Sequence, residues 1–378
     1  MDITILKIRK KAMRFSVNRD QILGPLQQIS RVVDKRQVMP ILSNVLVQCR
    51  NNQLIMTGTD IEIQVVAKLN VDDIREEGDI TIPAKKLLDI CKLLPADSMV
   101  KFDIEGEKAK VVCGRGRYSL STLPADIFPE FNQDTKSSFT MNAGKLKEGL
   151  DKTAFCMASN DVRYYLNGLE LSIDGSKISL VASDGHRLAM YDDDIGSDTG
   201  YKANIILPKK AVQELSRLLD DPEVDVDVSF SKNYIQIVYK NVVFSSKLFD
   251  ARFPDFSRSF NQPFLDSVMV DRVALKEALM RVEVLSNEKY KGVNFDIQSC
   301  SLKMSANNPE HDEAEEDMVI DYLGERVSIS FNAQYVLEAV SNSVGDTVGM
   351  TIAANASVCI LESQDKSLFK YIVMPMRL

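Results

Sequence analysis

The sequence predicts an α+β protein built from three copies of one small domain, each with two helices packed against antiparallel sheets. Three helix-like segments recur at spacings of 125 and 124 residues, beginning at Pro83, Pro208 and Asn332. An alternating apolar run precedes each segment and ends in a turn residue, at spacings of 124 and 124, at Asp60, Asp184 and Asn308. Such a period is the length of a whole domain, whereas solenoid repeats span roughly 20–50 residues.

The first copy reads, in order, as helix, strands, helix and strands. A helical pattern at 19–33 is followed by alternating runs at 44–49, 54–60 and 62–69, and the helix from Pro83 by runs at 101–106, 108–113 and 117–123. Alternation of apolar and polar residues is typical of half-buried strands. Turn residues mark the reversals, at Asn51-Asn52, Glu105-Gly106 and Asp174-Gly175. Short strands with two helices per copy favour antiparallel sheets that carry their helices on one face.

The three matched helices share one amphipathic pattern. Each carries small or apolar residues at positions i, i+3, i+4 and i+7, which lie on a single face of a helix. These positions are Leu87, Ile90, Cys91 and Leu94, then Val212, Leu215, Ser216 and Leu219, then Val336, Ala339, Val340 and Ser343. We expect this face to be buried against a sheet.

Two related segments separate the copies. FPEFNQDTKSSF at 128–139 and FPDFSRSFNQPF at 253–264 are polar or contain proline, and we expect extended connectors there. The predicted domains are therefore residues 13–136, 137–263 and 264–378. A second start-like segment opens at Met13, so we interpret residues 1–12 as an N-terminal extension.

The charge of the chain is divided between its structural elements. The net charge is −8, yet the six helical segments (19–36, 83–95, 142–158, 208–219, 271–285 and 332–344) together carry +6 and the remainder carries −14. Lysine-rich solvated helix faces would explain this, and so would a helical surface that faces a polyanion on a body that otherwise repels DNA.

Several functional classes are disfavoured. No apolar run approaches the roughly 18–20 residues that span a membrane, and the sequence lacks the GxxxxGK[ST], GxGxxG, GxSxG and HExxH motifs of common enzyme families. The six cysteines are scattered without a CxxC pair, which indicates buried free thiols in a reduced, cytoplasmic setting and makes a metal site improbable. We expect no catalytic residues, no metal and no cofactor.

Nine motifs, taken in order, identify a family. They are PLQQIS (25–30), PILSNVLVQ (40–48), GTDIE (58–62), DVRYYLNG (161–168), SDGHRLA (183–189), SKLFDARFPDF (246–256), LSNEKYKGV (285–293), ANNPEHDEAEE (306–316) and YIVMPMRL (371–378). Through them the chain resembles the bacterial DNA polymerase III beta subunit, or sliding clamp, family over residues 13–378. Repeats that meet head to tail can close into a ring, and the resemblance implies a head-to-tail homodimeric ring of six clamp domains.

The resemblance also implies a function. Such a ring encircles double-stranded DNA without sequence preference and tethers the replicative polymerase as a non-catalytic processivity factor. Its further partners would be clamp-loader subunits, other polymerases and repair proteins, which dock short peptide motifs in a hydrophobic groove. Carried over by position, the groove residues are Leu166, Ser183, Gly185, His186, Arg187, Leu188, Pro254, Arg258, Val358, Ile372, Val373, Met374, Pro375, Met376 and Arg377.

The DNA-binding candidates come from two sources. The resemblance supplies Arg36, Asn160, Tyr164 and Tyr165, and the repeat supplies the basic positions Lys85, Lys92, Lys210 and Arg217. At the last four positions the third copy has the neutral residues Gln334 and Ser341, so we expect DNA to lie towards the first two copies.

Simpler interpretations stay open for several of these residues. Met374 and Met376 could be ordinary core residues, although methionine is common on surfaces that accept several partners. His186 fits a groove wall better than a catalytic role, and Tyr164-Tyr165 could be aromatics at a strand entry rather than stacking residues. The lysines at 85–86 and 209–210 oppose the helix dipole, which favours contact with phosphate. A peptide-binding scaffold without DNA would share the groove but not the basic helices.

Overall fold

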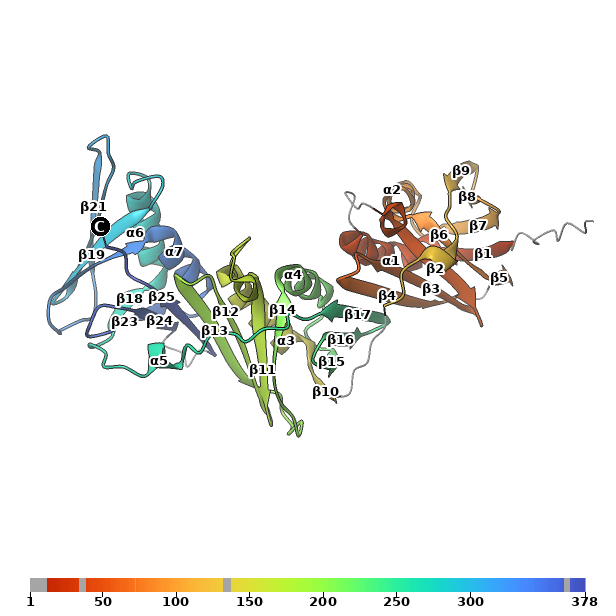
Figure 1. Ribbon diagram of the computed structural model, residues 1–378. Coiled ribbons are helices and arrows are strands. Elements are labelled where there is room, and N and C mark those ends of the chain that lie inside the picture. The colour runs from red at the N-terminus through yellow and green to blue at the C-terminus, as the bar shows by residue number, and fades with distance from the viewer. Residues whose placement is uncertain (1–11, 34–38, 72, 132–136, 364–367, 378) are drawn as a thin grey trace, which may run out of the picture. The chain divides into compact units, whose positions relative to one another are not determined.

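The computed structural model describes residues 12–33, 39–71, 73–131, 137–363 and 368–377 (Figure 1). Every strand pair in this part of the chain is antiparallel, as predicted. Two compact units emerge: Met1–Ala143 with Arg217–Leu248, and Gly144–Ser216 with Phe249–Leu378. Each unit contains two sheets.

The first unit holds a five-stranded and an eight-stranded sheet. The smaller one runs β5 (Asp73–Glu76), β1 (Met13–Asn18), β7 (Met99–Glu105), β8 (Lys108–Cys113) and β9 (Gly116–Ser121). The larger one runs β10 (Ser137–Asn142), β15 (Asp225–Phe230), β16 (Tyr234–Tyr239), β17 (Val242–Lys247), β4 (Ile63–Asn70), β3 (Gln53–Thr59), β2 (Asn44–Arg50) and β6 (Gly78–Pro83).

The second unit repeats this plan with an eight-stranded and a four-stranded sheet. The larger one runs β14 (Lys202–Pro208), β11 (Gly168–Asp174), β12 (Lys177–Ser183), β13 (Arg187–Asp194), β25 (Phe369–Val373), β24 (Cys359–Ser363), β23 (Thr347–Ile352) and β18 (Val268–Asp271). The smaller one runs β21 (Glu313–Val319), β20 (Ser301–Asn307), β19 (Gly292–Gln298) and β22 (Val327–Asn332).

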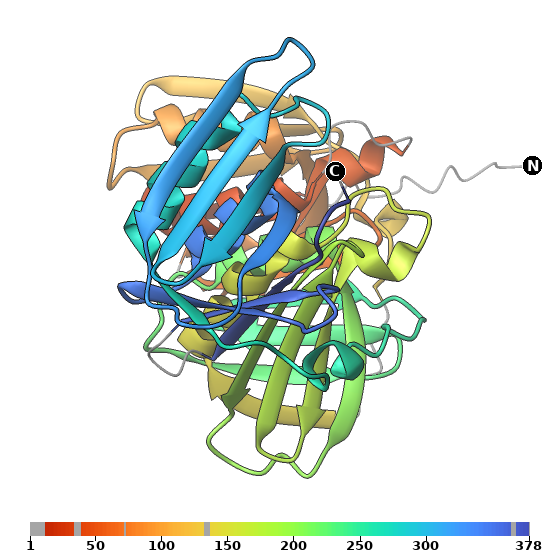
Figure 2. The same ribbon diagram turned by 90° about the vertical axis from the view of Figure 1, so that its left-hand side faces the viewer.

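Two helices belong to each repeat, as expected. They are α1 (Arg19–Val32), α2 (Ala84–Leu93), α3 (Ala143–Thr153), α4 (Lys209–Leu218), α6 (Arg272–Glu283) and α7 (Ala333–Asn342). Polar caps fix three of the starts: Asn18, Asp271 and Asn332 each accept backbone N–H bonds from the first turn. Helix α6 packs on one face of the β21-β20-β19-β22 sheet (Figure 2).

The predicted helix faces are buried at most of their positions. Leu87, Cys91, Val212, Leu215 and the matching residues of α7 are nearly inaccessible to solvent, whereas Ile90 and Ser216 are only partly covered. The predicted turns are also confirmed. Asn51 and Asn52 have φ of 50° and 58°, and Gly106 and Gly175 have φ of 64° and 63°, the left-handed region that tight hairpins require.

The second connector differs from the prediction. A short helix, α5 (Ser257–Phe260), interrupts the segment that we expected to be extended. The Asp255 carboxylate accepts the backbone N–H of Ser257 at 2.9 Å and so helps to start this turn. The segment therefore lies against the sheet as a folded strap.

Both eight-stranded sheets join two consecutive repeats. Strand β17 of the second repeat pairs with β4 of the first, and β25 of the third repeat pairs with β13 of the second. Because the hydrogen-bonded ladders cross from repeat to repeat, the pairing at these junctions is as continuous as it is within a repeat. This explains why three repeats give two compact units.

Candidate functional site

The predicted groove residues converge where β13 meets β25. Leu188 lies opposite Ile372 in this antiparallel pair, and the two are 2% and 4% exposed. They pack with Val358, Ala353 and Ile360 in one buried cluster. A neighbouring cluster contains Leu166 and shares flanking side chains with the first, so the apolar floor is continuous.

The turn that precedes β13 is held by its own side chains. The Asp184 carboxylate accepts the N–H groups of His186 and Arg187 at 2.9 and 3.0 Å. The Ser183 hydroxyl donates to the carbonyl of Arg187 at 2.7 Å and accepts the N–H of Gly185 at 3.1 Å. Gly185 has φ of 89°, a conformation that side chains rarely adopt. The motif SDGHRLA is therefore a rigid turn that presents Leu188.

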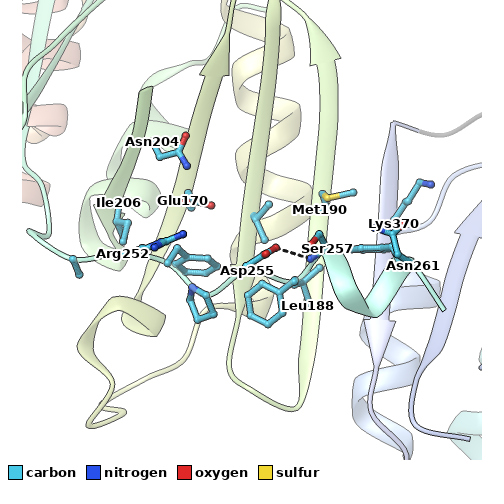
Figure 3. Close-up of a pocket in the computed structure, with 16 residues that line it drawn as sticks. Glu170, Leu188, Met190, Asn204, Ile206, Arg252, Asp255, Ser257, Asn261 and Lys370 are labelled. Carbon is cyan, nitrogen blue, oxygen red and sulfur yellow. Dashed lines mark hydrogen bonds between the residues drawn. The ribbon is translucent and has the colours of Figure 1, made fainter. Parts of the chain in front are cut away.

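A cavity of about 680 Å³ opens between the strap and the outer face of this sheet (Figure 3). Leu188 and Pro254 are its predicted lining residues. Sequence reasoning missed the apolar lining residues Val181, Met190, Ile206, Phe253, Phe256 and Phe260. Val181, Met190 and Ile206 lie on three different strands, and the three phenylalanines lie in the strap, so no local pattern in the sequence grouped them.

The cavity also has a polar end. Glu170, Asn204 and Arg252 line it together (Figure 3). Burial raises the pKa of the Glu170 carboxyl, and the nearby Arg252 guanidinium offsets part of that rise. Asp255, Ser257, Asn261 and Lys370 also line the cavity, so its surface combines apolar walls with polar and charged groups. A concave site of this kind can hold a peptide or a small molecule.

The C-terminal segment continues past β25 in extended form, as expected. The N–H of Met374 donates to the carbonyl of His186 at 2.9 Å, and that of Met376 donates to the carbonyl of Ser330 at 2.7 Å. Met374 is 45% exposed, so it is not a core methionine. Met376 and Arg377 line a second cavity, of about 470 Å³, beside Tyr290. Two predicted groove residues thus line each cavity, Leu188 and Pro254 in the first and Met376 and Arg377 in the second, and the other predicted residues line neither.

Arg163 lies at this site although the sequence did not single it out. Its guanidinium pairs with Asp161 at 2.9–3.0 Å and lowers the pKa of that carboxyl to about 2. It also donates to the carbonyl of Asp184 at 3.3 Å, and a Cβ added at Gly185 would come within 2.8 Å of it. Its place in the motif DVRYYLNG, next to Tyr164, was the available signal.

The basic positions on the helices are mostly solvent-facing. Lys85 and Lys92 are exposed on α2 of the first unit, Arg217 is exposed on α4, and Lys210 is partly covered there. Lys209 is different, because its ammonium donates to the carbonyls of Met157 and Ala158 and to the Ser159 hydroxyl. Burial lowers its pKa. These contacts engage the Lys209 ammonium within the protein, so the structure does not favour a phosphate contact for this residue.

The predicted DNA-contacting loop is only partly exposed to solvent. Asn160 is exposed, with φ of 60°. Tyr164 is 49% exposed, and its hydroxyl donates to the carbonyl of Asp250 at 3.0 Å. Tyr165 packs against the buried cluster around Leu166, which leaves less of its ring for stacking. Arg36 lies outside the described residues.

Two further findings concern the described part of the chain. None of its helices has the length and apolar character needed to cross a membrane. Within the same residues, no three His, Cys, Asp or Glu side chains gather as they would around a metal ion.

Comparison with known families gives one consistent result. Three family models match in order: the DNA polymerase III beta subunit N-terminal domain at residues 13–132, its central domain at 140–255 and its C-terminal domain at 260–377. The beta sliding clamps of Pseudomonas aeruginosa and Escherichia coli K12 are 40% and 38% identical over 367 residues, covering 97% of this chain and 100% of each relative.

Solved structures agree. A sliding clamp from Pseudomonas aeruginosa bound to griselimycin matches with a TM-score of 0.94 at 39% identity, and one from Bartonella birtlesii bound to griselimycin with 0.92 at 33%. Each match covers 97% of this chain and 100% of the other. The chain, with its three tandem clamp domains, therefore belongs to the DNA polymerase III beta subunit family, the sliding clamps, which are processivity factors of DNA replication and not enzymes.

Proposed function

We propose that two copies of this chain close head to tail into a ring that encircles duplex DNA and tethers the replicative polymerase in the cytoplasm. The same ring would hold clamp-loader subunits, other polymerases and repair proteins through the groove beside Leu188. The domains would be residues 13–136, 137–263 and 264–378, as the repeat predicts. The proposal rests on one observation. The two internal junctions use equivalent strands and leave one end strand in the first repeat and one in the third.

Each internal junction joins equivalent strands. The fourth strand of one repeat pairs with the last strand of the next repeat: β4 with β17, and β13 with β25. By the same rule the third repeat offers β21 and the first repeat offers β9, which are end strands of their sheets in the described chain. A second copy would supply the missing partner for each, and two such contacts close a two-fold ring.

The register of the internal junctions extends to this third one. Val66 lies opposite Val243 in the first junction. The equivalent of Val66 in the third repeat is Glu315, because the two residues have matching partners on the strand before their own. By the same criterion, the equivalent of Val243 in the first repeat is Arg117. The proposed contact between copies thus places an exposed arginine opposite an exposed glutamate.

The charges of the two edges support this pairing more broadly. Strand β21 carries Glu313, Glu315, Glu316 and Asp317, whereas β9 and the turn before it carry Arg115 and Arg117. Opposite charges on facing strands favour one partner and one register, and they disfavour pairing of each edge with itself.

The groove would receive an apolar peptide segment. Its floor is apolar and continuous, Met374 is half-exposed at its side, and the cavity ends in a few polar groups. The basic residues on α2 and α4, together with Asn160 and Tyr164, would contact the phosphates. Since griselimycin occupies two related clamps, we expect it to bind this chain as well, and it can serve as a probe of the groove.

Retention on DNA tests the proposal. The dimer should be loaded by a clamp loader onto nicked circular DNA and onto the same DNA after linearisation, and its release followed by gel filtration. A ring should stay on the circle and leave the linear DNA from its ends. Equal loss from both substrates by a chain that remains dimeric would contradict the encircling mechanism.

A further inference from the structure

A largely covered arginine lies directly behind the groove wall. Arg187 is the first residue of β13, next to Leu188, and successive side chains of a strand point to opposite faces. Leu188 lines the cavity, whereas Arg187 does not. The Arg187 side chain is only 12% exposed. Its place in the family motif assigned it to the groove, but its contacts lie on the other side of the strand.

Each nitrogen of the Arg187 guanidinium already has an acceptor. Nε donates to the Asp184 carboxylate at 3.0 Å, Nη2 donates to the carbonyl of Phe155 at 2.9 Å, and Nη1 donates to the Glu338 carboxylate. The guanidinium carbon also lies 4.5 Å from the centroid of the Tyr335 ring. A planar group can hold three acceptors and an aromatic face at once, whereas a lysine ammonium is a point charge without such a plane.

These contacts connect three elements of the second unit. Glu338 and Tyr335 belong to α7, Phe155 to the turn after α3, and Arg187 to β13. The His186 ring stacks on the same Tyr335 ring, with centroids 6.4 Å apart and planes 20° from parallel. The carbonyl of His186 in turn accepts the N–H of Met374.

We propose that Arg187 is a positioning residue, which does not touch the bound peptide but ties β13 to helix α7 and so fixes Leu188 in the wall of the groove, with His186 and Met374 beside it. The inference rests on the proposed groove. A chain of contacts carries it: Glu338 and Asp184 hold the guanidinium, the guanidinium holds Tyr335, and Tyr335 supports His186.

A Glu338 variant can distinguish a positioning role of Arg187 from direct contact with the peptide. Glu338 lies on α7 and lines neither cavity, so its replacement removes no contact with a bound peptide. If Arg187 acts by position, Glu338→Gln should weaken griselimycin binding about threefold and Arg187→Lys about tenfold. The double variant should then be no weaker than Arg187→Lys alone, because both changes break one linkage. Arg326→Lys is the matched control, since Arg326 pairs bidentately with Asp296 at the surface of the same unit, and it should bind like the wild type.

A spectroscopic readout is independent of any ligand. The chain has two histidines, His186 and His311, so its imidazole ring signals in ¹H–¹³C spectra can be assigned with one His311→Gln variant. The His186 signals should move in both Arg187→Lys and Glu338→Gln, because the ring shifts relative to Tyr335. The His311 signals, from an exposed loop, should stay in place.

The outcomes are distinct. Wild-type affinity in Glu338→Gln together with unmoved His186 signals would overturn the positioning role and make Arg187 a direct ligand contact. Failure of the wild-type protein to bind griselimycin would instead contradict the groove, while the His186 signals would still decide what Arg187 does. Both variants should be compared with the wild type in thermal unfolding, so that a loss of fold is recognised.

Discussion

The two internal junctions share a backbone plan but differ in the residues of their cross-strand pairs, and one of these pairs lies at the groove. In the β13–β25 junction Leu188 lies opposite Ile372, and at the equivalent positions of the β4–β17 junction Gln64 lies opposite Ser245. Leu188 and Ile372 belong to one buried apolar cluster. One repeated geometry therefore gives an apolar floor at one junction and an amide and a hydroxyl at the other. The side chains of this pair decide where an apolar peptide can bind.

We expect the largest effect from giving one junction the cross-strand pair of the other. Leu188→Gln with Ile372→Ser gives the second junction the residues of the first, and griselimycin affinity should fall by about 3 kcal/mol or more, because the apolar floor is lost. Calorimetry measures it. The matched control is Gln64→Leu with Ser245→Ile at the first junction, which should leave that affinity unchanged. Full binding by the first variant would show that the pair does not define the groove.

The basic residues on the helices of the first two repeats should make DNA binding depend on salt, whereas the equivalent residues of the third repeat should not. Replacing Lys85, Lys92, Lys210 and Arg217 with serine should reduce passive DNA affinity at least about tenfold. Each phosphate that is no longer neutralised flattens the slope of log K against log salt by about 0.9. Fluorescence anisotropy across a salt series measures this. As a control, Gln334→Ser in the third repeat should leave the slope unchanged.

That variant also separates affinity from topology. Once loaded, the quadruple variant should remain on closed circular DNA as long as the wild type does, because a closed ring needs no affinity to stay linked. Rapid release from circles by a dimeric quadruple variant would mean that the charges, and not the ring, hold the DNA.

The proposed third junction, between copies, should depend on charge where the internal ones do not. Arg117→Glu should weaken each contact between copies by about 1–2 kcal/mol, because a favourable cross-strand pair becomes repulsive. Sedimentation would show monomer at concentrations where the wild type is dimeric. Adding Glu315→Arg should restore much of the dimer. A double variant no better than the single one would reject the register that places these residues opposite each other.

The smallest expected effect concerns the first junction alone. The Ser245 hydroxyl is buried and has no hydrogen-bond partner, so Ser245→Ala should raise the free energy of unfolding by about 1 kcal/mol. Ser246→Ala is the matched control, because its equally buried hydroxyl donates to the carbonyl of Lys247 at 2.8 Å and its loss should destabilise. Urea denaturation distinguishes the two. Destabilisation by Ser245→Ala would reveal a partner for this hydroxyl.

Most of the fold could be predicted because its signals are local. Helices α2, α4 and α7 begin within one residue of the expected positions, since a proline or an asparagine cap precedes each. Helix α5 was missed because the signal for an extended Phe-Pro segment outweighed that for a single turn, to which Asp255 contributes one hydrogen bond. Helix caps and hydrophobic periodicity can be recognised in a sequence, whereas a short turn stabilised by one side chain cannot.

The site was less predictable because its determinants are far apart in the sequence. Leu188 and Pro254 could be placed by motif, but the burial of Arg187 depends on Glu338, 151 residues away. Lys209 was predicted to contact phosphate because its acceptors are also far away in the sequence. They are the carbonyls of Met157 and Ala158. Charge in a sequence does not reveal which acceptors the fold will bring to it.

The unpartnered hydroxyl of Ser245 has a consequence for how the three junctions can evolve. The strands of an internal junction are tethered by the chain itself, so their effective concentration is high and the pairing tolerates a poor contact. The junction between copies has no tether, and its contacts alone must hold the ring closed at cellular concentrations. Mutational drift should therefore accumulate at the tethered junctions, while selection on closure and on opening for loading acts on the edges that carry Arg117 and Glu315.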